Sequence, residues 1–83
     1  MDNLKNLESV NNDVPIIVDY NHMDEEGGVV LDTLGSIESI KEIPLREGEV
    51  IWISDTQIEY FAVLIRRRSS WVAIPLVATR NEL

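Results

Sequence analysis

The strongest pattern in the chain is a series of three apolar runs in its C-terminal half, each of which predicts a β-strand. All three runs are rich in β-branched and aromatic residues, which strands favour. They cover residues 49–54, 58–66 and 71–77. Polar residues 67–70 separate the last two runs, and a short polar connection of this kind predicts a tight hairpin.

Both faces of the long run at 58–66 are apolar. Side chains alternate between the two faces of a strand. One face carries Tyr60, Ala62 and Leu64, and the other carries Phe61, Val63 and Ile65. A domain of this size can bury both faces of a strand only in a closed barrel or at an interface. We therefore expect either barrel closure or self-association, with Trp52 and Leu64 as core residues.

The N-terminal half contains two further predicted strands. Residues 14–20 are mostly apolar, and Pro15 places this strand at a sheet edge or marks its start, because proline lacks an N–H group. The polar segment that follows closes with Gly27 and Gly28, which predicts a hairpin turn. A short returning strand is then expected at 29–31.

One segment between these strands follows helical spacing. Ile37 and Ile40 recur three residues apart, a spacing that favours a helix over a strand. Ser36 fits the N-cap position, and Pro44 cannot continue a helix. The pattern predicts one short helix at 36–42.

Five short strands and one short helix predict a mainly β fold, either a small SH3-like barrel or an open five-stranded barrel. Residues 45–75 resemble the central three-stranded meander of such barrels. The resemblance concerns the strand pattern and implies no particular activity.

Length and composition place the chain in one domain. Its 83 residues are 45% hydrophobic, which suffices for a core, and we expect a flexible arm at 1–13 followed by a single domain at 14–83. The chain has no cysteine, so disulfides, thiolate metal sites and a cysteine nucleophile are excluded. No apolar run approaches the roughly 20 residues that span a bilayer. The first residues lack the layout of a signal peptide, so we expect a cytoplasmic protein with no membrane partner.

Charge is distributed unevenly along the chain. The net charge is −8, yet residues 60–83 carry four arginines and one glutamate. An acidic surface repels phosphate, so nucleic acid is an unfavoured partner. The acidic half is interpreted as a solubilising surface or as a face that docks on a basic protein, and Asp24, Glu25 and Glu26 are its candidate contact residues.

The arginine triplet is the other candidate binding feature. Arg66, Arg67 and Arg68 precede Trp71, and basic residues beside an aromatic ring can bind single-stranded nucleic acid. They can also protect the end of an apolar strand from aggregation, or pair with the acidic half of the chain. All three interpretations stay open at this point.

Candidate chemistry is sparse. His22 is the only histidine, and no serine near it has a nucleophile-elbow context. The segment that starts at Asp19 begins like a calcium loop but places Met23 and Val30 where oxygen ligands are required. We therefore predict no catalytic residue, no cofactor and no metal.

These patterns favour a non-enzymatic protein-interaction module that associates with itself and whose protein partner is unknown. One alternative is an acidic inhibitor that mimics nucleic-acid phosphates and blocks a basic protein. A second is a small RNA-binding barrel that uses the arginine triplet.

Overall fold

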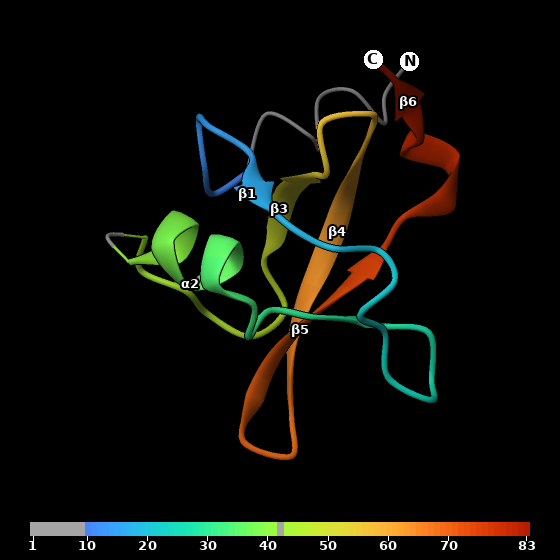
Figure 1. Ribbon diagram of the computed structural model, residues 1–83. Helices are drawn as coiled ribbons and strands as arrows, with labels where there is room; N and C mark the ends of the chain where they lie inside the picture. Colours follow the sequence, from blue (N-terminus) through green and yellow to red (C-terminus); the bar gives the residue numbers. More distant parts are fainter. Residues whose placement is uncertain (1–9, 42) are drawn as a thin grey trace.

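The computed structural model describes residues 10–41 and 43–83 (Figure 1). Within these residues the chain forms six strands, one α-helix and one 3-10 helix. They are β1 (Ile16–Ile17), β2 (Val29–Val30), α2 (Leu34–Ile40), β3 (Val50–Ser54), β4 (Ile58–Arg67), β5 (Ser70–Pro75), the 3-10 helix η1 (Val77–Thr79) and β6 (Asn81–Glu82).

The strands pair in the order β1–β3–β4–β5–β2, and β6 pairs with the beginning of β4. β1 runs parallel to β3, whereas the other pairs are antiparallel. The long strand β4 passes through the middle of the sheet, and its hairpin with β5 projects at the end opposite β6 (Figure 1). The sheet curls into half a barrel. The prediction of a mainly β fold with an open five-stranded sheet and one short helix is thus confirmed.

The core lies on the inner face of the curled sheet. Ile51 and Ile53 of β3 and Leu64 of β4 are fully buried there, which confirms the prediction for Leu64. The prediction for Trp52 is wrong, because this residue is only half-buried and lies outside the core cluster. Ile51 and Ile53 occupy the inner face, so strand alternation turns Trp52 to the outer face. There its indole N–H donates a hydrogen bond to Glu59 at 3.1 Å.

The outer face of the sheet carries a second set of apolar side chains. Val50 lies opposite Val63, and Trp52 lies opposite Phe61, in the register of β3 and β4. All four are half-buried. The second apolar face expected from the sequence is therefore present in the folded sheet.

The expected hairpin between the strands at 14–20 and 29–31 is wrong. β1 runs parallel to β3 instead, and β2 pairs with β5. After β1 the chain first crosses the open side of the sheet (Figure 1). The turn at Gly27 and Gly28 therefore connects β2 to the residues around Met23 and not to β1. Met23 bridges Val29 there, and the Asp24 N–H donates to the Gly28 carbonyl at 2.8 Å.

Helix α2 begins two residues before the predicted start. Thr33 is the N-cap, and its hydroxyl accepts a hydrogen bond from the Ser36 N–H at 3.2 Å. Ser36 is therefore inside the helix and not at its N-cap, contrary to the prediction. Thr33 and Ser36 are both good N-cap residues, and Gly35 disfavours a helix. Local preference alone therefore placed the N-cap at Ser36 instead of Thr33. α2 ends at Ile40, and the predicted end at residue 42 lies outside the described residues.

Two serines of α2 cover the outer edge of β1. The Ser36 hydroxyl donates to the Ile17 carbonyl at 2.7 Å, and the Ser39 hydroxyl accepts from the Ile17 N–H at 3.0 Å. An uncovered edge strand would offer these backbone groups to another chain. The helix thus closes this edge against strand addition.

β1 pairs only with the last two residues of β3, and the chain that precedes β1 covers the rest of that side of β3. Residues 1–9 of the expected arm lie outside the described residues, and the Asn11 N–H donates to the Val50 carbonyl at 3.0 Å. The Asn12 side chain then takes the place of a strand. Its Oδ1 accepts from the Trp52 N–H at 2.9 Å, and its Nδ2 donates to the Trp52 carbonyl at 2.8 Å.

Candidate functional site

The turn between β4 and β5 positions the arginine triplet. The predicted hairpin at 67–70 is confirmed, with Arg68 and Ser69 at its tip. Their φ angles are 53° and 68°, so both central residues adopt the left-handed conformation of a type I′ turn. This turn matches the twist of the two strands, although neither residue is a glycine.

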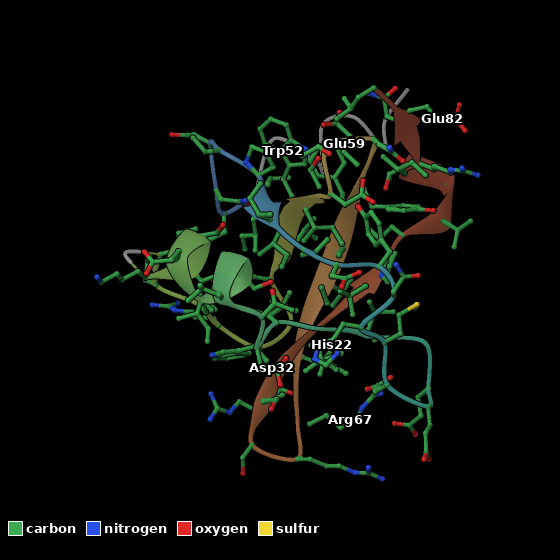
Figure 2. The ribbon with its side chains drawn as sticks, viewed as in Figure 1. His22, Asp32, Trp52, Glu59, Arg67 and Glu82 are labelled. Atoms are coloured by element: carbon green, nitrogen blue, oxygen red, sulfur yellow. The ribbon has the colours of Figure 1, made fainter. Side chains whose placement is uncertain are left out.

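The other two arginines point to opposite faces of the hairpin, and each is engaged within the chain. The guanidinium of Arg66 lies over the Trp71 ring, 4.7 Å from its centroid. Arg67 forms ion pairs with Asp24 and, at 2.8 Å, with Glu26 (Figure 2). The fold therefore divides the triplet and does not assemble it into one basic patch.

Asp24 holds the loop before β2 against this hairpin. Its Oδ1 accepts hydrogen bonds from the N–H groups of Gly28 at 2.8 Å and Glu26 at 3.0 Å. These bonds, the one from Gly28 foremost, lower the pKa of the Asp24 carboxyl together with the positive charge of Arg67, against the opposing effect of desolvation. Asp24 thus remains a carboxylate that ties the loop to β4.

The charged residues line a cleft of about 270 Å³ beside the hairpin. Its lining consists of Asp24, Glu25, Glu26, Val30, Arg67, Arg68, Ser70 and Val72. Five of the six residues predicted to bind a partner meet here, whereas Arg66 lies on the other face. Because two carboxylates already pair with Arg67, the cleft holds this arginine in an internal ion-pair network.

The single histidine lies beside an acidic side chain. Nε2 of His22 is 2.5 Å from Oδ1 of Asp32, and both side chains are about half exposed (Figure 2). Within residues 10–41 and 43–83, no group of three or more histidine or carboxylate side chains is arranged to hold a metal ion. The pair connects the segment before β2 with the segment after it.

A second hollow, which we name the tyrosine groove, lies between the loop before β2 and the junction of β5 with η1. Its volume is about 320 Å³. It is lined by Tyr20, Met23, Gly27, Ile58, Tyr60, Ile74, Pro75 and Val77. The rings of Tyr20 and Tyr60 lie edge to face, with centroids 5.5 Å apart and planes at 80°. The Tyr20 hydroxyl donates to the Ile58 carbonyl at 2.9 Å, which fixes its ring.

The pairing of β5 explains why the groove stays open. β2 pairs only with Val72 and Ala73, so the last two residues of β5 extend beyond it. Pro75 has no N–H group to donate to a further strand. The loop at Gly28 then passes close to β5, where a Cβ on this glycine would lie 2.2 Å from a Val72 methyl carbon.

The groove combines apolar exposure with negative charge. Val77 is 77% exposed and Met23 is 46% exposed, so two large apolar side chains of the groove lie in water. Burial raises the pKa of Tyr20, and the negative charges of Asp55 and Glu59 contribute to the same shift. A ligand in this groove would therefore meet apolar side chains in a negative potential.

Sequence analysis missed this groove because it placed Tyr60 on one face of an apolar strand and singled out neither tyrosine as a binding residue. Each one does pack against the core cluster, but each also lines the groove. Tyr20 and Tyr60 lie 40 positions apart in the chain, and only the crossing segment after β1 brings them together. The one local signal was Pro75, two residues before Val77, because a proline has no N–H group with which to continue strand pairing.

Comparisons with known proteins add no relative. Neither a scan against protein families, nor a search of curated proteins, nor a search of solved structures finds a match to this chain. In the described part of the chain, no helix is both long enough and apolar enough to cross a bilayer, and α2 has only seven residues.

Proposed function

We propose that this protein is a non-enzymatic protein-interaction module and that the tyrosine groove is its binding surface. The observation that carries the proposal is the exposure of Val77 and Met23 beside two tyrosine rings. Binding that removes exposed apolar groups from water lowers the free energy of the complex. Tyrosine adds a large rigid contact surface, which is why it is enriched at protein interfaces.

The size of the groove suits part of a protein chain. Ligand sites occupy roughly 300–1,000 Å³, and the tyrosine groove lies at the lower end with about 320 Å³. Such a volume takes a few side chains. The cleft beside Arg67 is less suited to this role, because Arg67, Asp24 and Glu26 already pair with one another there.

A matched pair of variants tests the groove. Val77→Asp places a carboxylate on its rim, and Val14→Asp makes the same change at a residue that is 72% exposed and does not line the groove. Both proteins should fold like the unchanged chain, as judged by circular dichroism. We expect proteins captured from a source lysate by the unchanged chain to be lost with Val77→Asp and retained with Val14→Asp. If capture is the same for both variants, the groove is not the binding surface.

Self-association is a second candidate, and the outer face of the sheet supports it. Val50, Trp52, Phe61 and Val63 form a continuous apolar surface across β3 and β4, outside the core cluster. Homodimers with two-fold symmetry are the commonest oligomers. Light scattering with size exclusion is the test. We expect twice the chain mass of 9.5 kDa. A single species at the mass of one chain, across dilution and salt, would exclude the dimer.

A further inference from the structure

We infer that the tyrosine groove binds a short segment of a partner protein in which an apolar side chain stands next to an arginine or lysine. The inference rests on the proposed function and specifies the chemistry of the partner. It is carried by the composition of the groove and by the charges on the two segments that border it.

The apolar part of the ligand follows from the groove lining. Of its eight lining residues, six are aliphatic or aromatic residues or proline, and the other two are Gly27 and Met23. Met23 itself is flexible and polarisable, so it adapts to ligand side chains of different shapes. An apolar side chain that enters this groove exchanges water for these contacts, whereas a charged group placed at its centre would lose its hydration.

The cationic part follows from carboxylates that have no cationic partner. The bordering segments at 19–27 and 55–59 contain no lysine or arginine. Asp24 and Glu26 pair with Arg67, and Glu25 lines the cleft beside Arg67 and Arg68 rather than the groove. At the other end, in residues 10–41 and 43–83, neither Asp55 nor Glu59 forms an ion pair. The local charge is thus negative and uncompensated beside the groove.

The neighbouring elements do not supply the missing cation. Arg80, which follows η1, pairs with Glu82 at 3.0 Å. Asp55 is fixed in place because its Oδ1 accepts the N–H groups of Gln57 and Ile58, each at 2.9 Å. Because Ile58 lines the groove, a ligand cation at this end of it would meet the fixed Asp55 carboxylate. The groove therefore favours arginine or lysine next to the apolar anchor.

The test begins with a selection of random short peptides displayed on phage, against the full chain and against its Val77→Asp variant. Peptides enriched only on the unchanged chain bind at the groove. One of them, labelled with a fluorophore, is then the probe for affinity by fluorescence anisotropy. Two substitutions that each remove one negative charge complete the set. Asp55→Asn removes the charge, while its amide oxygen can still accept the N–H groups of Gln57 and Ile58. Glu38→Gln makes the same change on the exposed surface of α2 as a control.

We expect the groove-dependent peptides to share an apolar residue next to arginine or lysine. Val77→Asp should weaken the probe by at least about tenfold, because it places a carboxylate where the apolar anchor binds. Asp55→Asn should weaken it by roughly two- to fivefold, the range of one exposed ion pair, and Glu38→Gln should leave it unchanged. Salt should weaken binding to the unchanged chain, since exposed charges are screened.

Two results would overturn the inference, and they differ in what else they overturn. Groove-dependent peptides without arginine or lysine, or a probe affinity that Asp55→Asn and salt leave unchanged, would exclude the cationic partner and leave the binding surface intact. Selection that yields no peptide sensitive to Val77→Asp would overturn both the inference and the proposed function.

Discussion

Asn12→Ala should remove much of the stability of this small domain. The Asn12 side chain makes the hydrogen bonds to the Trp52 backbone that a neighbouring strand would otherwise make, because β1 does not reach this part of β3. Asn12 is 8% exposed. Its amide makes three hydrogen bonds to the main chain, two with Trp52 and one in which Nδ2 donates to the Val14 carbonyl at 2.8 Å. Alanine cannot replace any of them.

The magnitude follows from these three bonds. A buried intramolecular hydrogen bond contributes about 0.5–1.5 kcal/mol, and a polar group left without a partner costs about 1–3 kcal/mol. The Trp52 N–H and carbonyl lose their partner in the variant, so we expect a loss of about 2–4 kcal/mol in the free energy of unfolding. A small domain has only about 5 kcal/mol at the lower end of the usual range. The variant should therefore be close to unfolding at room temperature.

Urea denaturation followed by tryptophan fluorescence measures this loss. With a slope of about 1–3 kcal/mol per M for a small protein, the midpoint should fall by about 1–3 M. Asn11→Ala is the control, since the Asn11 side chain makes one exposed bond, to the Pro44 carbonyl at 3.1 Å. We expect its midpoint to change by a few tenths of a molar at most, as for an ordinary surface substitution. Equal midpoints for Asn12→Ala and the unchanged chain would show that water satisfies the edge of β3 equally well.

Four further substitutions test other parts of the fold, the first three by the same urea denaturation and the fourth by acid unfolding. Leu64→Ala should cost about 2–5 kcal/mol, because Leu64 is fully buried, and an unchanged midpoint would contradict its place in the core. Gly28→Ala should cost about 1–3 kcal/mol, since the new Cβ would lie 2.2 Å from a methyl carbon of Val72, and no loss would mean that the loop moves aside freely. Ser69→Gly should stabilise the hairpin by about 0.5–1 kcal/mol, because the φ of 68° suits glycine, and destabilisation would refute the left-handed turn. Asp24→Asn should weaken the acid dependence of stability: the folded-state pKa of Asp24 is lowered, so its contribution is complete above about pH 4 and disappears as the pH falls through the folded-state pKa. Identical acid unfolding curves for Asp24→Asn and the unchanged chain would contradict this role.

The strands of the C-terminal half could be predicted because their pattern is local. β3, β4 and β5 are antiparallel neighbours joined by short turns, so each run of apolar residues meets the next one along the chain. β1 could not be placed in this way. Its partner is β3, which lies more than thirty residues later, and parallel pairing leaves no turn signal in the sequence. The choice was decided by long-range hydrogen bonds, including those from α2 to Ile17.

The candidate sites show the same limit. The sequence identified Arg67 and Asp24 as binding residues and included their pairing among its alternatives, but these residues lie 43 positions apart and their contact depends on the crossing of the chain after β1. For Trp52 the period-two pattern was correct, but it does not say which of two apolar faces is the inner one. The same ambiguity hid the tyrosine groove, because an aromatic residue in an apolar strand is usually part of the core.

The backbone groups at one edge of the sheet are hydrogen-bonded, whereas apolar side chains of the tyrosine groove are exposed, and this difference indicates how the domain would bind a partner. Asn12 occupies the edge of β3, and Ser36 and Ser39 occupy the edge of β1, so these backbone groups are already satisfied. A partner strand that paired there would have to displace these bonds, which makes strand addition at this side of the sheet unfavourable. Val77 and Met23 have the opposite arrangement, since their apolar side chains remain in water. Association at this domain should therefore depend on side-chain contacts in the tyrosine groove, and substitutions at its rim should affect binding without affecting the sheet.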